Sequence, residues 1–315
     1  MKKVLVTGGA GFIGSHLVER LNNQASFVIA LDNFDSYYSA KEKRRNLAAV
    51  LRNKKFTLIK GDVRNTSLLE NILDTFSPNS IVHLAAKVGA RNSLIHPKEY
   101  TEVNTLGTLN LLERIKNRKN ITLIFASSSS VYGDNKKIPF EEKDIVDNQL
   151  SPYAVSKRSA ELFCKKYAKL YKIPITCLRF FSVYGPRQRP DLIIRKIIEK
   201  ILRKETVELY GSGHSARDYT YITDIIDGIQ SCLNTHFGFE IINLGNSKPI
   251  TLLALVALIE KMLNKKARIK YLPPHQADAI ITYADIKKAK ELLGWHPRVT
   301  IRKGLAKLKA LYSTT

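Results

Sequence analysis

The feature that most constrains this chain is a cluster of glycines directly after its first apolar segment. Residues 3–7 read Lys-Val-Leu-Val-Thr, and Gly8, Gly11 and Gly14 follow at three-residue spacing before an amphipathic segment. A tight turn from a strand into a helix, with a ligand close to the backbone, requires residues without a Cβ. The N–H groups that open such a helix attract phosphates. The spacing therefore predicts a dinucleotide-binding turn.

The first half of the chain alternates short apolar runs with longer amphipathic segments. Runs rich in Val, Ile, Leu and Phe are typical of parallel strands that are covered on both faces. Alternation with helices indicates right-handed βαβ units and a Rossmann-type, doubly wound parallel sheet in an α/β fold. The predicted strands are 3–7, 27–31, 56–60, 81–84, 121–127 and 175–180, and the predicted helices are 12–22, 40–52, 68–76, 100–117 and 153–170.

The rhythm changes after residue 181, where prolines interrupt the chain and shorter segments follow. We expect a smaller α/β substrate domain over the carboxyl edge of the sheet, where ligands bind in open α/β folds. The predicted NAD-binding domain is 1–181 with about 218–243, and the predicted sugar-nucleotide domain is 182–217 with 244–315. The segments expected in this half are 191–203, 206–210, 218–222, 224–233, 241–243, 252–263, 267–271, 285–293 and 301–311.

Composition limits the remaining possibilities. The chain has 315 residues, of which 44% are hydrophobic, and no apolar run is long enough to span a membrane. Its first residues do not form a signal peptide, so we expect a cytoplasmic protein. Its three cysteines suit neither a disulfide framework nor a metal site. The net charge of +23 favours phosphorylated substrates, but the basic residues are spread along the chain, so no nucleic-acid partner is expected.

The residues after the predicted strands point to NAD. The second strand ends at Asp32, and Asn33 and Phe34 follow, without an arginine. A carboxylate there accepts hydrogen bonds from ribose hydroxyls and repels the extra phosphate of NADP. Asp62 and Val63 follow the third strand and are expected beside the adenine.

Two further segments carry catalytic residue types. Tyr153 and Lys157 are four residues apart and share one face of a predicted helix, while a run of four serines that contains Ser128 ends the fifth strand. A free tyrosine titrates near ~10, and a lysine cation together with the nicotinium charge lowers that pKa. The combination predicts a phenol that acts as a base, with a serine hydroxyl holding the substrate oxygen.

This combination resembles the extended short-chain dehydrogenase/reductase family of NAD-dependent nucleotide-sugar epimerases and dehydratases. The resemblance covers essentially the whole chain and includes His83-Leu84-Ala85-Ala86, Asn104, Arg217-Asp218-Tyr219 and the Ala284-Asp285 helix start. It implies that Tyr153 deprotonates the sugar 4-hydroxyl, that hydride passes to NAD and returns to the other face of a 4-keto sugar, and that Arg217 holds the diphosphate. The implied cofactor contacts are Gly8, Gly11, Phe12, Ile13, Gly14, Asp32, Asn33, Asp62, Val63, Leu84, Ala85, Ala86, Asn104, Tyr153 and Lys157.

Within the family, the chain most resembles the enzymes that epimerise UDP-glucuronate to UDP-galacturonate. Dehydratases carry an acidic pair directly after the catalytic hydroxyl residue, and decarboxylases commonly keep a glutamate there, whereas this chain has Ser129 and Ser130. Hydroxyls of Ser129 and Ser182 and the cation of Arg189 would hold the uronate carboxylate. The implied substrate contacts are Arg91, Ser128, Ser129, Ser182, Arg189 and Arg217.

Alternatives remain open at this point. The alternative substrates are UDP-glucose and UDP-N-acetylglucosamine. The alternative reactions are those of a decarboxylase or a dehydratase. The alternative outside enzymes is a protein that binds NAD or nucleic acid without catalysing a reaction. The resemblance also implies a homodimer that pairs the helices 100–117 and 153–170 of two subunits. Two departures stand out: Lys87 occupies a position that is usually uncharged, and residues 276–279 read Gln-Ala-Asp-Ala in place of the usual Gly-Asp-Val.

Overall fold

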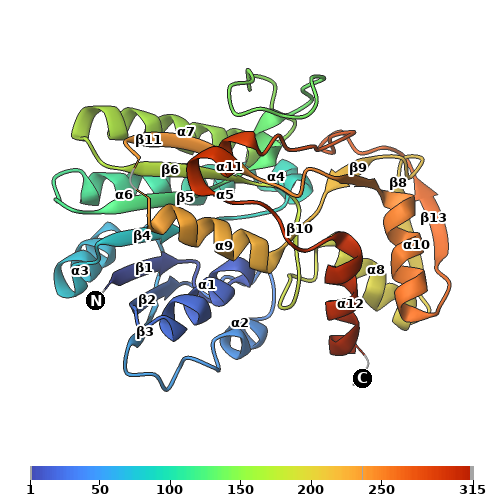
Figure 1. The fold of residues 1–315 in the computed structure, drawn as a ribbon, viewed down its shortest axis with the longest axis horizontal. Coiled ribbons are helices and arrows are strands. Elements are labelled where there is room, and N and C mark those ends of the chain that lie inside the picture. The colour runs from blue at the N-terminus through green and yellow to red at the C-terminus, as the bar shows by residue number, and fades with distance from the viewer. Residues whose placement is uncertain (1, 236, 313–315) are drawn as a thin grey trace.

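A seven-stranded parallel sheet organises the molecule. The computed structural model describes residues 2–235 and 237–312, and its sheet has the order β11-β6-β5-β4-β1-β2-β3 (Figure 1). The order in which the chain adds strands reverses between β1 and β4, as in a doubly wound fold. The strands are β1 (Lys3–Thr7), β2 (Phe27–Asp32), β3 (Phe56–Lys60), β4 (Ser80–His83), β5 (Thr122–Ser128), β6 (Ile175–Phe180) and β11 (Phe239–Leu244). The predicted Rossmann-type fold class is confirmed.

Two apolar cores cover the two faces of this sheet. Along β1, Val4 and Val6 face one core and Leu5 faces the other, because successive side chains of a strand point in opposite directions. One core is completed by α1 (Phe12–Asn23) and α9 (Ile222–Leu233), and the other by α3 (Thr66–Phe76), α6 (Gly107–Ile115) and α7 (Pro152–Tyr171).

Two of the predicted helices are wrong in extent. The helix expected at 40–52 is only α2 (Ala40–Asn46), after which the chain continues in separate turns. The helix expected at 100–117 is three pieces: α5 (Pro97–Tyr100), a π-helical turn η1 (Thr101–Leu106) and α6. Periodicity does not reveal a π turn, which inserts one residue into an otherwise helical pattern. It buries Asn104, whose side chain then reaches neighbouring elements.

The later part of the chain forms a smaller lobe beside the carboxyl edge of the sheet, with α8 (Ile193–Leu202), α10 (Leu252–Leu263) and α12 (Ile301–Tyr312) on the right in Figure 1. Short strands in this part of the chain form separate two-stranded pairs apart from the main sheet. The remaining elements are α4 (Ala90–Ile95), η2 (Ser129–Tyr132), β7 (Val183–Tyr184), β8 (Thr206–Tyr210), β9 (Ala216–Asp218), β10 (Thr220–Tyr221), β12 (Pro249–Thr251), β13 (Arg268–Leu272) and α11 (Lys287–Leu293).

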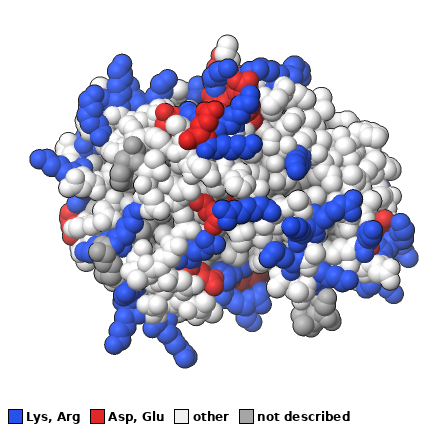
Figure 2. All heavy atoms as spheres, in the orientation of Figure 1, with Lys and Arg blue, Asp and Glu red and all other residues white. Residues whose placement is uncertain are grey.

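The surface reflects the charge balance of the sequence. Figure 2 shows lysine and arginine side chains scattered over the visible face among uncharged residues, with fewer acidic side chains. Among the described residues, no helix is both long and apolar enough to cross a membrane.

Candidate functional site

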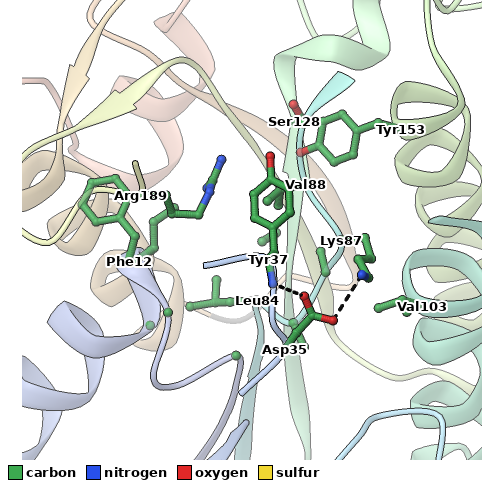
Figure 3. Close-up of a pocket in the computed structure, with 18 of the residues that line it drawn as sticks. Phe12, Asp35, Tyr37, Leu84, Lys87, Val88, Val103, Ser128, Tyr153 and Arg189 are labelled. Atoms are coloured by element: carbon green, nitrogen blue, oxygen red, sulfur yellow. Dashed lines mark hydrogen bonds and ion pairs between the residues drawn. The ribbon is translucent and has the colours of Figure 1, made fainter. Parts of the chain in front are cut away.

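The main cavity lies at the carboxyl ends of the parallel strands and has a volume of about 360 Å³. Its walls are the loops after β1, β2, β3, β4, β5 and β6, which belong to segments far apart in sequence (Figure 3). The predicted site residues that line it are Gly8, Gly11, Phe12, Ile13, Gly14, Asp32, Asn33, Asp62, Val63, Leu84, Ala85, Ala86, Ser128, Ser129, Tyr153, Lys157, Ser182 and Arg189.

The glycine turn forms one end of the cavity and has no room for larger residues. A Cβ on Gly14 would lie 2.1 Å from the carbonyl oxygen of Gly8, and one on Gly8 would lie 2.8 Å from the Ala85 nitrogen. Gly8 also has a φ of +69°, which favours glycine. Helix α1 begins at this turn, and no side chain caps its N-terminus. Its first N–H groups are thus left for a ligand in the cavity.

Acidic groups define the end of the cavity beyond this turn. Asp32 is buried and accepts hydrogen bonds from the backbone N–H groups of Ala10 (3.0 Å) and Phe34 (2.8 Å). Asp62 accepts from Asn33 (2.9 Å) and Arg64 (3.0 Å). Burial raises the pKa of Asp62, but the hydrogen bonds from Arg64 and Asn33 outweigh it and hold that pKa at about 2.

The catalytic candidates meet at the opposite end. Tyr153 lies in the first turn of α7, whose N-cap Ser151 accepts a hydrogen bond from the Ala154 N–H, and its phenol faces the Ser128 hydroxyl (Figure 3). Burial raises the pKa of Tyr153, while the hydrogen bond with Ser128 and the charge of Arg189 lower it in part.

Lys157 lies one turn further along α7, under the same part of the cavity. Its ammonium donates to the Ala126 carbonyl at 2.8 Å, and burial lowers its pKa to about 8. The lysine therefore anchors to β5.

Asn104 lies behind the cavity wall and does not line the cavity. Its side chain accepts from the Lys87 N–H (2.7 Å) and donates to the Lys87 carbonyl (3.0 Å) and to the Ser156 hydroxyl (2.9 Å). It thus fixes the loop after β4 against α7. This geometry does not provide the direct cofactor contact that was expected of Asn104.

The predicted substrate residues fall into two places. Ser129, Ser182 and Arg189 line the main cavity, with the Arg189 guanidinium paired to Asp191 through two bonds of 2.9 Å. Arg91 and Arg217 line a second cavity of about 200 Å³. The two cavities adjoin along the chain, because Ala90 and Leu192 line the first, whereas the residues that follow them, Arg91 and Ile193, line the second.

Several residues of the site were not found from the sequence. Asp278 lies in residues 276–279, which differ from the usual family sequence, and pairs with Arg91 at 2.5 Å. The Arg91 guanidinium lies 3.7 Å from the ring centre of Tyr210. Lys87, noted only as unusual, forms ion pairs with Asp35 and Glu99. The charge of Lys87 was the signal available in the sequence, but its partners lie in the loop after β2 and in α5 and leave no local pattern.

The sequence matches the family described as GDP-mannose 4,6 dehydratase over residues 5–308. It is 46% identical to an uncharacterised protein of Methanocaldococcus jannaschii, covering 96% of this chain and 94% of that protein. It is 41% identical to a UDP-glucuronate 4-epimerase of Thermodesulfobacterium geofontis, covering 96% and 93%. The structure is similar to that of the UDP-glucuronic acid 4-epimerase of Bacillus cereus in complex with UDP-glucuronic acid and NAD, with a TM-score of 0.93, 36% identity and 99% of both chains covered.

Proposed function

Because this chain belongs to the nucleotide-sugar epimerase and dehydratase family of extended short-chain dehydrogenases/reductases, we propose that it is an NAD-dependent UDP-sugar 4-epimerase. The proposed reaction converts UDP-glucuronate to UDP-galacturonate through a 4-keto intermediate. The observation that carries the choice of reaction is the distribution of carboxylates in the main cavity. Among the described residues that line it, the acids are Asp32, Asp35 and Asp62, all on the loops after β2 and β3.

This distribution favours epimerisation over dehydration. A dehydratase needs an acid and a base beside the reacting sugar, because it removes and returns protons at neighbouring carbons. The positions after Ser128 are Ser129 and Ser130, and the Ser130 hydroxyl accepts a hydrogen bond from the Ser128 hydroxyl. Hydroxyls at these positions do not supply that chemistry, so the cavity supports oxidation and re-reduction at one carbon.

The cofactor end of the cavity fits NAD. The glycine turn leaves space that a Cβ would fill, and the uncapped start of α1 suits a pyrophosphate. Asp32 can accept from ribose hydroxyls beside its two backbone donors and would repel a 2′-phosphate. Bound NAD would supply the hydride acceptor and, later in the same turnover, the hydride donor.

The catalytic end assigns roles to three side chains. Tyr153 takes the proton from the sugar 4-hydroxyl and returns it at the end of turnover, Ser128 hydrogen-bonds the reacting oxygen, and Lys157 holds the nicotinamide ribose and favours the phenolate. The hydrogen bond between Ser128 and Tyr153 supports this assignment, because it aligns both groups on one substrate atom.

A uronate substrate follows from the polar groups around that end. We assign the substrate carboxylate to the hydroxyls of Ser129 and Ser182 and to the cation of Arg189, all of which line the cavity. The diphosphate then extends into the second cavity, toward Arg91 and Arg217. Held in this way, the carboxylate of a β-keto acid is restrained from leaving as CO₂.

The assembly and the division of the chain are part of the same proposal. We assign NAD binding to residues 1–181 with 218–243 and sugar-nucleotide binding to 182–217 with 244–315. We propose a homodimer that pairs η1, α6 and α7 of two subunits, because Leu106 of η1 and Val155 and Leu162 of α7 expose apolar side chains. The three cysteines are buried and unpaired, which supports a reducing, cytoplasmic location.

An NMR time course tests the proposed reaction directly. Purified protein mixed with UDP-glucuronate, without added NAD, is expected to accumulate UDP-galacturonate, because the cofactor is regenerated in each turnover. Conversion of UDP-glucose or UDP-N-acetylglucosamine alone would replace the uronate as substrate. Stoichiometric release of CO₂ would replace epimerisation by decarboxylation. Protein that contains NAD and converts none of these sugars would contradict the proposal.

A further inference from the structure

Lys87 connects two opposite walls of the cofactor cavity. It lies in the loop after β4, and its ammonium is 3.1 Å from a carboxylate oxygen of Asp35, in the loop after β2 (Figure 3). A second carboxylate, that of Glu99 in α5, lies 2.8 Å from the same ammonium. Both Lys87 and Asp35 line the cavity, whereas Glu99 does not. Glu99 therefore holds the lysine on its own wall while the lysine reaches across to Asp35.

The order of strands defines what this bridge crosses. In the sheet, β1 lies between β2 and β4, and the glycine turn follows β1. An ion pair between the loops after β2 and β4 therefore spans the end of β1. A dinucleotide places its pyrophosphate at that turn, next to the start of α1.

Both ends of the bridge are fixed to the fold. The Lys87 backbone is held by two hydrogen bonds to Asn104, of 2.7 and 3.0 Å. The Asp35 carboxylate accepts a hydrogen bond from the Tyr37 N–H at 2.9 Å, and the Asp35 backbone carbonyl accepts one from the Lys43 ammonium at 2.7 Å. Burial raises the pKa of Asp35, but the hydrogen bonds from Tyr37 and Lys87 hold that pKa below its ordinary value. The pair is therefore ionised at neutral pH.

We propose that the Lys87–Asp35 ion pair is a clasp that closes over the bound cofactor and slows its release. The inference rests on the proposed binding of NAD and adds to it a determinant of retention that is separate from the chemical step. An epimerase regenerates NAD in place, so a slow escape of the cofactor costs no turnover. Escape of the pyrophosphate requires the two loops to separate, which breaks the ion pair.

The test is the rate of NAD release, measured without any sugar nucleotide. Protein loaded with radiolabelled NAD is chased with excess unlabelled NAD, and retained label is counted over time at about 0.05 M and about 0.5 M NaCl. Lys87→Met is expected to release NAD about fivefold faster at the lower salt, the scale of one partly exposed ion pair. Salt should accelerate release from the parent protein and leave Lys87→Met nearly unchanged.

Two further variants separate the clasp from other effects of charge. Asp35→Asn keeps an oxygen for the Tyr37 N–H and should match Lys87→Met, and the double variant should release NAD no faster than either single one. Lys98→Met removes the same charge from a side chain of α5 that is 89% exposed and pairs only loosely with Glu102, and should release NAD like the parent.

Either of two results overturns the clasp: equal release from Lys87→Met and the parent at both salts, or equal effects of Lys87→Met and Lys98→Met. Neither result bears on the reaction, since conversion of UDP-glucuronate is measured separately.

Discussion

At the residue scale, Tyr153 is the side chain on which the proposed chemistry depends most. Tyr153→Phe keeps the ring that packs edge-on against Tyr100, 6.1 Å away, and removes only the hydroxyl. Turnover of UDP-glucuronate is therefore expected to fall by about 10²–10⁴-fold, the range for loss of a general base. Bound NAD, measured after denaturation of the purified protein, should be unchanged. Normal turnover in this variant would exclude Tyr153 as the base.

The ionisation of the same phenol gives a second prediction. Burial raises the pKa of Tyr153, so in protein without added NAD its phenolate should appear only above the ordinary value of about 10. The positive nicotinium ring acts in the opposite direction and should bring the ionisation to lower pH. An ultraviolet difference titration of the parent minus Tyr153→Phe, with and without NAD, measures this shift. The same titration curve in both conditions would rule out cofactor tuning.

Arg189 determines the third prediction at this scale. Its guanidinium forms an ion pair with Asp191 and still lines the cavity. Arg189→Ala should therefore lower kcat/KM by roughly tenfold for a uronate substrate and much less for a neutral hexose. The measurement is kcat/KM for UDP-glucuronate and UDP-glucose. Arg187→Ala is the matched control, because Arg187 pairs with Glu19 and does not line the cavity. Equal losses for both sugars would remove the carboxylate contact.

At the scale of elements, a buried ion pair joins α7 to the neighbouring strands beneath the site. Glu161 accepts two bonds of 2.9 Å from Arg179 of β6 and one of 2.6 Å from Ser127 of β5, and both charged side chains are at most 1% exposed. Glu161→Ala leaves the Arg179 cation buried without its partner and should cost about 3–5 kcal/mol of the free energy of unfolding.

Urea denaturation measures this loss. Glu70→Ala, which removes a surface partner of Arg114 and Arg118, should cost far less, because solvent screens exposed pairs. A similar small loss for Glu161→Ala would show that the buried pair does not stabilise the fold.

The elements also show how far the sequence predicts the structure. The glycine turn, the strand ends and the Tyr153–Lys157 helix were predictable, because local periodicity and steric limits determine them. The π turn at Thr101–Leu106 was not predictable, because it is associated with the contact of Asn104 with Lys87, which is a tertiary interaction. The same holds for Asp35 and Asp278, whose partners Lys87 and Arg91 lie far away in sequence.

At the scale of the whole molecule, the basic charge is spread over the surface, and α7 and η1 expose apolar side chains. Lysines and arginines are scattered over the visible face in Figure 2, which suits attraction of a nucleotide sugar more than binding of a polyanion along one groove. By contrast, Val155 and Leu162 lie seven residues apart on one face of α7, and Leu106 is exposed on the adjacent η1. Because the family resemblance pairs these elements between two subunits, this apolar face is the expected contact between them.

Leu162→Arg tests that contact in the intact protein. Leu162 is 50% exposed, so an arginine there disturbs no core, yet two copies would bring like charges together across a two-fold interface. Light scattering on a size-exclusion column should give a dimer for the parent and a monomer for Leu162→Arg. Leu51→Arg, at a side chain that is 51% exposed outside the proposed interface, should remain dimeric. A parent protein that is monomeric at all concentrations, or a Leu162→Arg variant that is still dimeric, would place the contact elsewhere or remove it.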